Sequence, residues 1–152
     1  MKRVVLVVAS ILMLQAPVVK AADYALGIDL VRLVDRNQDD GMFNLWVQFP
    51  TRGGGAVMLG YASGDNLTVL DAGYKHYAGG RLNGVYFQGG IGYYETDQDD
   101  DLGFVGAIGY ERKLAKHFAV GGSVKMIAGV DESLTGLESP VFQPTLSMAL
   151  VF

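Results

Sequence analysis

An alternation of apolar with polar or small residues recurs along most of this chain and constrains its fold more than any other feature. In residues 43–49 (FNLWVQF), the odd-numbered positions are Phe, Leu, Val and Phe, whereas the even-numbered positions are Asn, Trp and Gln. Successive side chains of a β-strand point to opposite faces, so a period of two indicates a strand. The same pattern indicates strands at residues 24–33, 56–63, 67–77, 84–95, 102–111, 118–128 and 142–152. We therefore predict an all-β fold of about eight strands.

The two faces of these strands differ in the size of their side chains. Large apolar residues occupy one face, as at Phe87, Ile91 and Tyr93, whereas glycine, alanine and polar residues occupy the other. Small residues relieve crowding inside a narrow barrel, and large apolar residues are suited to contact with lipid. This separation of large apolar residues from small and polar ones predicts a closed antiparallel up-and-down transmembrane barrel. A soluble eight-stranded ligand carrier, with its apolar face inside, is the alternative.

The first residues, MKRVVLVVASILMLQAPVVKAAD, have the composition of an export signal. A basic start at Lys2 and Arg3 precedes an apolar run that is too short to cross a bilayer as a helix. The side chains around Ala21 favour cleavage after that residue, with cleavage after Ala22 as the alternative. We predict a cleavable signal peptide at residues 1–21, rather than a buried N-terminal helix, and one barrel domain at residues 22–152.

The predicted mature chain is acidic. The formal net charge is −4 for the whole chain, and loss of Lys2, Arg3 and Lys20 with the signal peptide would lower it to −7. Binding to a nucleic-acid backbone needs clustered Lys and Arg, so nucleic acid is not an expected partner. The chain has no cysteine, which excludes disulfides and thiolate metal sites.

Two kinds of connection join the predicted strands, and they differ in the sign of their charge. Long connections are rich in Asp and Glu, whereas tight turns carry Arg and Lys. The long connections lie at residues 35–41, 96–101 and 129–140, and the tight turns at residues 52–55, 78–81 and 112–116. With the first strand starting on the periplasmic side, all the long loops would reach the outer surface.

The last predicted strand, residues 142–152 (FQPTLSMALVF), alternates and ends on an aromatic residue. Together with the export signal and the segments GGIGYYE and GAIGYER, it resembles the small OmpA/OmpX-like β-barrels of Gram-negative bacteria. The resemblance implies an integral location in the bacterial outer membrane, surrounded by outer-membrane lipid and lipopolysaccharide. It also implies that the barrel-assembly machinery reads this strand through Leu146, Met148, Leu150 and Phe152. Pro144 departs from an ideal strand because it cannot donate a ladder hydrogen bond.

Several charged residues fall on the inward face of the predicted barrel. They are Asp29, Asp71, Lys75, Glu111 and Lys125. An unpaired charge inside a narrow lumen is strongly disfavoured. We therefore predict that Lys125 pairs with Asp29 or Asp71, and that Lys75 pairs with Glu111. Such pairs would form a plug rather than a water path, because eight strands leave an interior just wide enough for side chains.

The second long loop contains candidates for weak binding of a divalent cation. Asp97, Asp99 and Asp101 place oxygen donors at alternate positions, as in a calcium loop. The position at which such a loop needs a closing glutamate is occupied by Ile108. A solvated acidic loop is therefore the alternative, and no cofactor is expected.

A lipid-modifying enzyme in this membrane would need Ser, His and a carboxylate close together near one leaflet. The two histidines, His76 and His117, fall at the predicted periplasmic end, whereas lipopolysaccharide occupies the outer leaflet. We predict no catalytic residues and expect a non-enzymatic protein with a role in envelope integrity or in surface interaction through its acidic loops. A narrow pore for ions or small solutes is the first alternative, and a lipid-modifying enzyme the second.

Overall fold

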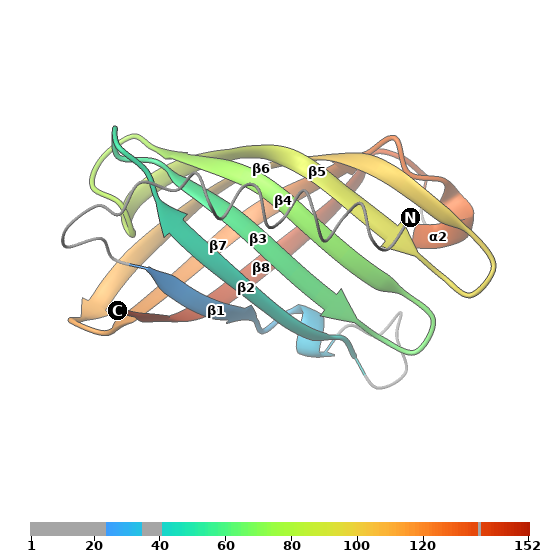
Figure 1. Cartoon of the computed structure of the whole chain (residues 1–152), viewed down its shortest axis with the longest axis horizontal. Helices are drawn as coiled ribbons and strands as arrows, with labels where there is room; N and C mark the ends of the chain where they lie inside the picture. Colours follow the sequence, from blue (N-terminus) through green and yellow to red (C-terminus); the bar gives the residue numbers. More distant parts are fainter. Residues whose placement is uncertain (1–23, 35–40, 137) are drawn as a thin grey trace.

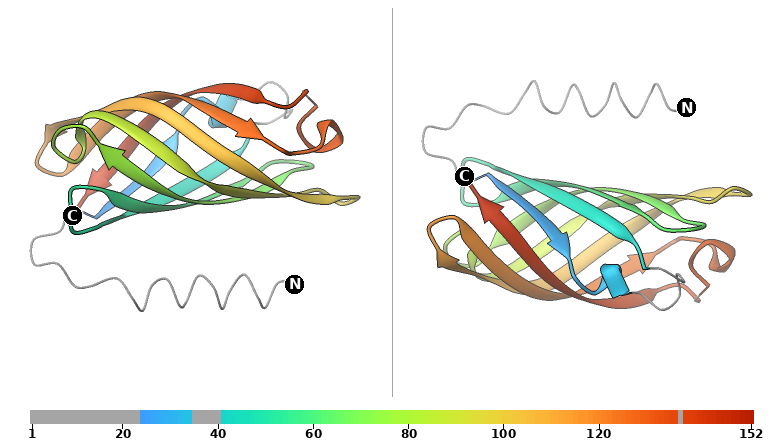
Figure 2. Two further views of the ribbon diagram at one scale, coloured as in Figure 1. Left: turned by 90° about the horizontal axis from the view of Figure 1, so that it is seen from above. Right: turned by 90° about the horizontal axis from the view of Figure 1, so that it is seen from below.

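Eight antiparallel strands form a closed barrel in the computed structural model, which describes residues 24–34, 41–136 and 138–152 (Figure 1). The strands are β1 (Ala25–Asp29), β2 (Phe43–Pro50), β3 (Ala56–Ser63), β4 (Thr68–Tyr77), β5 (Asn83–Glu95), β6 (Asp100–Ala115), β7 (Phe118–Ala128) and β8 (Val141–Val151). Each strand pairs with its neighbours in sequence, and β1 pairs with β8 to close the ring (Figure 2). The predicted all-β, antiparallel up-and-down barrel is confirmed. The predicted signal peptide, residues 1–21, lies outside the described residues.

β1 is shorter than the sequence predicts, because the chain turns away after Asp29. The predicted strand at residues 24–33 ends at Asp29, and Arg32–Val34 form a short 3-10 helix, η1. Asp29 Oδ1 accepts a hydrogen bond from Val31 N at 3.0 Å. A carboxylate that binds a backbone N–H two residues ahead offers the chain an alternative to the strand ladder. Residues 30–33 are therefore not strand, contrary to the pattern.

β6 extends farther at both ends than the sequence predicts. It starts at Asp100 and ends at Ala115, so the predicted turn at residues 112–116 shortens to Lys116 and His117. Strand partners are available for the added residues, since Arg112 pairs with Asn83 of β5. The register between β6 and β7 shifts between Lys113 and Ala115, as at a β-bulge.

Burial alternates along the strands, as the sequence pattern predicts. On β5, Tyr86 and Tyr94 are buried, whereas Phe87 and Ile91 are 52% and 45% exposed. A soluble protein seldom buries charged residues, whereas this barrel buries Lys75, Glu111 and Lys125 and exposes many large apolar side chains on its outer face. Its apolar exterior, here named the exterior belt, includes Leu45, Val85, Phe87, Ile91, Phe104, Ile108, Val124, Leu146 and Leu150.

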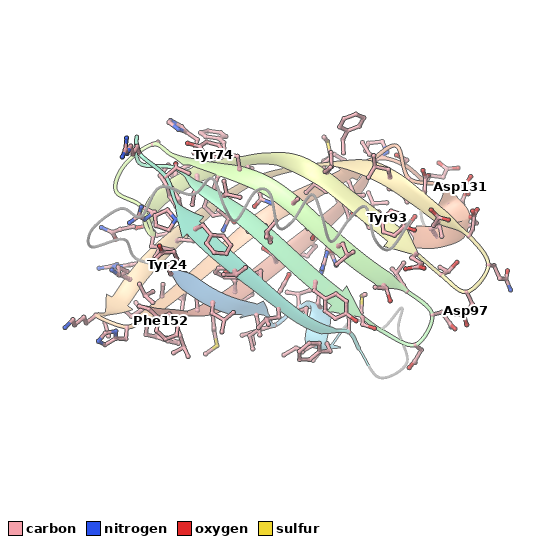
Figure 3. All side chains as sticks on the ribbon, viewed as in Figure 1. Tyr24, Tyr74, Tyr93, Asp97, Asp131 and Phe152 are labelled. Atoms are coloured by element: carbon pink, nitrogen blue, oxygen red, sulfur yellow. The ribbon has the colours of Figure 1, made fainter. Side chains whose placement is uncertain are left out.

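The two ends of the barrel differ in their connections. Tyr24, Tyr74 and Phe152 lie at the end with the tight turns, whereas Asp97 and Asp131 lie at the opposite end (Figure 3). We name these the turn end and the loop end. No helix among the residues described here is long and apolar enough to cross a membrane.

A short helix, α2 (Glu132–Thr135), lies in the connection between β7 and β8 at the loop end (Figure 1). Asp131 caps it, because Asp131 Oδ1 accepts a hydrogen bond from Ser133 N at 2.8 Å. This hydrogen bond holds the pKa of Asp131 below its usual range. The backbone of Gly136 has a φ of 68°, a left-handed conformation that ends the helix.

Glycine allows backbone and side chains to approach closely inside the barrel. A Cβ on Gly90 would lie 2.2 Å from Ala72 O, and a Cβ on Gly27 would lie 2.3 Å from the Trp46 ring. Gly89, one residue before Gly90, points outward and has open space at the same position. Glycine is therefore required by packing at positions 27 and 90.

Gly90→Ala is expected to destabilise the barrel, because the added methyl group would collide with the β4 backbone. Overpacking of this kind typically costs about 1–3 kcal/mol. Gly89→Ala is the matched control and should change the free energy of unfolding by no more than about 0.5 kcal/mol. Urea unfolding in lipid vesicles, followed by the fluorescence of Trp46, measures the free energy of unfolding of both variants. Equal losses for Gly90→Ala and Gly89→Ala would contradict the close contact between Gly90 and the β4 backbone.

Candidate functional site

Three charged side chains form an ion-pair cluster in the part of the lumen nearer the loop end, and we name this cluster the loop-side tier. Lys125 Nζ of β7 donates to Asp71 Oδ2 of β4 at 2.7 Å. Arg32 Nη2 of η1 lies 3.6 Å from the same oxygen. All three side chains are at most 10% exposed. One carboxylate is thus shared by two cations in a region that excludes most water, where an unpaired charge would be strongly unfavourable.

Asp29 is the other partner that the sequence allows for Lys125. Its carboxylate instead accepts hydrogen bonds from backbone N–H groups. Its Oδ1 accepts hydrogen bonds from Val31 N at 3.0 Å and from Leu146 N at 3.2 Å. Asn44 Nδ2 donates to Asp29 O at 2.9 Å. Asp29 therefore joins β1 to β2 and β8, and the ion pair of Lys125 forms with Asp71.

The part of the lumen nearer the turn end holds a second cluster, which we name the turn-side tier. Lys75 of β4 and Glu111 of β6 form a buried ion pair, as the sequence predicts. Tyr77 Oη donates to Glu111 Oε2 at 2.5 Å and accepts from Gln48 Nε2 at 2.8 Å. Neutral hydrogen-bonding groups thus surround the ion pair and help to offset its desolvation.

The ammonium of Lys75 also lies against two aromatic rings. Its Nζ is 5.1 Å from the ring centroid of Trp46 and 4.4 Å from that of Tyr86. A cation within about 6 Å of an aromatic ring is attracted by the negative face of that ring, most strongly when water is excluded. The turn-side tier therefore holds Lys75 with one carboxylate and two aromatic rings.

Sequence reasoning missed Arg32 as a lumen residue. Continuing the alternation of β1 places Arg32 on the outward face, and only the turn after Asp29 brings it inward. It also missed Tyr86, although the signal was present in the pattern. Large aromatic side chains on an inward face need small neighbours, and a Cβ on inward Gly109 would lie 2.7 Å from Tyr86 Cζ.

A small cavity of about 70 Å³ lies in the lumen. Asp71 and Lys125 of the loop-side tier and Lys75 of the turn-side tier all line it. This volume is well below the roughly 300–1,000 Å³ that is typical of sites for small organic molecules. Side chains therefore fill most of the lumen between the tiers.

The residues that resemble an assembly signal lie on the outer face of β8 and at Phe152, which directly follows it. Leu146, Leu150 and Phe152 are exposed there, and Met148 is partly exposed. Phe152 N donates to Tyr24 O at 2.9 Å, which ties the end of the chain to the start of the barrel. The outward direction of these side chains is as predicted, and their recognition by the barrel-assembly machinery stays a prediction.

The carboxylates of the acidic segment between β5 and β6 do not form a cluster of metal ligands in the described part of the chain. The residues that the structure describes contain no group of three His, Cys, Asp or Glu that could hold a metal ion. Asp97, Asp99 and Asp101 are thus not brought together. Asp99 Oδ1 accepts from Asp100 N at 2.9 Å, and Asp101 Oδ2 accepts from Asp131 N at 3.0 Å. The carboxylates of Asp99 and Asp101 instead accept hydrogen bonds from backbone N–H groups of the loops.

The two histidines lie at the turn end, outside both charged tiers. His76 points outward from β4, and His117 occupies the turn between β6 and β7. His117 Nδ1 lies 2.9 Å from Val151 O. Neither histidine forms a hydrogen bond with a serine or a carboxylate in the described part of the chain.

Lys125→Met should destabilise the barrel, because it leaves Asp71 with only the longer contact to Arg32. Removing one partner of a buried ion pair typically costs about 3–5 kcal/mol. The double variant Lys125→Met/Asp71→Asn removes both charges and should recover part of this loss. Lys116→Met, on an exposed turn, is the control and should cost less than about 1 kcal/mol. Urea unfolding compares the variants, and equal stability of Lys125→Met and Lys116→Met would contradict the pairing.

Comparison with known proteins adds no assignment to this site. No family model matches the chain, and no curated protein or solved structure shows significant similarity to it. The charged lumen, the exterior belt and the acidic loops are therefore the features from which a function has to be argued.

Proposed function

We propose that this protein is an integral β-barrel of the Gram-negative outer membrane, of the OmpA/OmpX-like kind. In this proposal it has no enzymatic activity and contributes to envelope integrity or to surface interaction through its acidic loops. The exterior belt is the observation that carries the proposal. Phe104 and Ile108 are 71% and 54% exposed there, while Lys75 and Glu111 are buried inside. An apolar surface that surrounds a barrel in this way is suited to lipid rather than to water.

The closure of the barrel supports a location in a membrane. Every strand pairs on both sides, so the sheet has no open edge. A bilayer core offers no hydrogen-bond partners, and only helices and closed barrels satisfy their own backbone groups there. A soluble ligand carrier would instead keep apolar side chains inside a ligand cavity, whereas this lumen is occupied by two charged tiers.

The two ends of the barrel support an orientation. The acidic connections at the loop end are the longer ones, and outer-membrane barrels have long loops outside and short turns in the periplasm. The export signal expected at residues 1–21 and the outward side chains of β8 are consistent with assembly by the barrel-assembly machinery. In this orientation the exterior belt contacts outer-membrane lipid and lipopolysaccharide.

Ile108→Arg distinguishes a lipid-facing exterior from a water-facing one. Ile108 lies in the middle of β6, opposite Phe87 of β5, and is exposed. An arginine on the lipid face near the middle of a bilayer costs about 2–4 kcal/mol, whereas exposed substitutions in water usually change stability by less than about 0.5 kcal/mol. We expect the larger loss, measured as the free energy of unfolding in lipid vesicles.

Gln98→Arg, in the exposed loop between β5 and β6, is the matched control and should leave stability almost unchanged. Membrane fractionation, followed by gel electrophoresis with and without boiling, tests the location directly. A faster unboiled band in the outer-membrane fraction is expected for a closed barrel. A soluble protein with no heat-dependent shift, or a stable Ile108→Arg variant, would overturn the proposal.

Conductance measurements separate this proposal from a narrow pore. The charged lining of the lumen favours a pore, but the cavity between the tiers is only about 70 Å³. We therefore expect no discrete conductance steps when the protein is reconstituted into planar bilayers. Reproducible conductance steps that are lost after heat denaturation would contradict a sealed barrel and indicate a pore for ions or small solutes.

A further inference from the structure

A groove of about 280 Å³ crosses the exterior belt where β1 meets its two neighbours, β2 and β8 (Figure 2). We name it the seam groove. Every residue that lines it is apolar, and the set consists of Leu26, Gly27, Ile28, Leu45, Phe118, Met148, Ala149 and Leu150. These residues belong to β1, β2, β7 and β8. The groove therefore offers a hydrocarbon chain apolar contacts from four strands.

The short ladder between β1 and β2 explains why the barrel surface is hollow here. The backbone pairing of these two strands stops at Gly27. At Asp29, the side-chain amide of Asn44 takes the place of the ladder. Asn44 Nδ2 donates to Asp29 O at 2.9 Å, and Asn44 Oδ1 accepts from Asp29 N at 2.5 Å. A side chain thus fills the space between strands that a backbone ladder would close, next to Leu45 of the groove.

The tight turn between β6 and β7 borders the seam groove at the turn end. Phe118 directly follows this turn and lines the groove. His117 O accepts from Val151 N at 3.1 Å, and His117 Nδ1 lies 2.9 Å from Val151 O. Val151 follows Leu150, which also lines the groove. These contacts fix the turn beside the groove, and they place Lys116, the other residue of the turn, at its turn end.

Arg112 supplies a second cation on the same side of the groove. It pairs with Val120 of β7, and Val120 pairs with Met148 of β8, which lines the groove. Adjacent strands are about 4.8 Å apart, so the backbones of Arg112 and Met148 are separated by roughly 10 Å. Arg112 and Lys116 are both exposed, and neither forms an ion pair with a described residue. Both cations are therefore available to a negatively charged partner.

The charge of the turn end favours an anionic partner over a cationic one. The described turns at this end, residues 51–55, 78–82 and 116–117, contain Arg52, Arg81 and Lys116 but no Asp or Glu. Lys and Arg next to an apolar surface attract anionic lipid headgroups. An apolar groove that ends beside two unpaired cations matches the two parts of an anionic phospholipid, its acyl chain and its phosphate.

We propose that the seam groove binds one acyl chain of an anionic phospholipid and that Lys116 and Arg112 bind its phosphate. The phosphate oxygens accept charge-assisted hydrogen bonds from both side chains. In a zwitterionic phospholipid, the headgroup ammonium competes with these cations for the phosphate. The inference rests on the proposed membrane location, which puts the turn end in the leaflet built from phospholipid rather than from lipopolysaccharide.

The test is native mass spectrometry of the full barrel, extracted in detergent and titrated with a single lipid. The probes are palmitoyl-oleoyl phosphatidylglycerol, which is anionic, and palmitoyl-oleoyl phosphatidylethanolamine, which is zwitterionic. Their acyl chains are identical, so a difference in affinity reports the headgroup. Phosphatidylglycerol should bind at least about fivefold more tightly, which is the effect expected for one cation near an anionic lipid.

Charge variants test the two cations. Arg112→Gln and Lys116→Gln should each weaken phosphatidylglycerol about fivefold and leave phosphatidylethanolamine almost unchanged. Arg112→Lys and Lys116→Arg keep the charge and should retain most of the affinity. Arg52→Gln is the matched control, because it removes the same charge from the turn between β2 and β3, which does not line the groove. It should leave both affinities almost unchanged.

Leu26→Trp tests the groove itself. The larger side chain should occupy the space of the acyl chain and weaken both lipids severalfold, because van der Waals packing drives association in apolar surroundings. Val85→Trp is the matched control, since Val85 lies on the exterior of β5, away from the groove, and is 42% exposed against 36% for Leu26. It should change neither affinity.

Three results would overturn the inference. The two lipids could bind equally well, Arg52→Gln could weaken phosphatidylglycerol as much as Arg112→Gln and Lys116→Gln do, or folded Leu26→Trp could bind both lipids as the wild type does. If Leu26→Trp does not fold, the charge variants decide the matter. A membrane-embedded barrel with no headgroup preference contradicts this inference alone, whereas a soluble protein would overturn the proposed function as well.

Discussion

Closing eight strands into a barrel leaves an interior only as wide as the side chains that point into it, and the rest of this structure follows from that constraint. The β4 backbone approaches Gly90 so closely that a Cβ would lie 2.2 Å from Ala72 O. Side chains from different walls meet in the centre, as Lys75 of β4 does with Glu111 of β6. Small residues and paired charges fill the middle of the lumen, and buried apolar clusters around Ile127 and Leu82 lie beyond them. The remaining large apolar side chains lie outside.

The alternation of residues was sufficient to predict the strands and their two faces, because a period of two is a local property of the chain. It also predicted the pairing of Lys75 with Glu111. It could not choose between Asp29 and Asp71 for Lys125, since depth in the lumen depends on the stagger between strands that are not neighbours. It placed Arg32 on the wrong face, because the turn after Asp29 interrupts the alternation.

The two tiers stabilise their cations in different ways. In the loop-side tier, two cations share Asp71, and the nearer one, Lys125, lies at 2.7 Å. In the turn-side tier, Lys75 has Glu111 to itself and lies 4.4 Å from the Tyr86 ring. Aromatic faces attract a cation without adding a charge that must itself be desolvated. Lys75 is therefore stabilised by aromatic rings as well as by Glu111. The two cations of the loop-side tier depend more strongly on the charge of Asp71.

Two aspartates at the loop end start short helices in the same way. Asp29 accepts from Val31 N after β1, and Asp131 accepts from Ser133 N after β7. Each carboxylate satisfies a backbone donor that the strand ladder would otherwise need, so a short helix starts there. These two helices bring Arg32 and Leu134 over the lumen. One helix thus adds a guanidinium to the loop-side tier, and the other adds Leu134 to the buried apolar cluster that contains Met42, Val69 and Ile127.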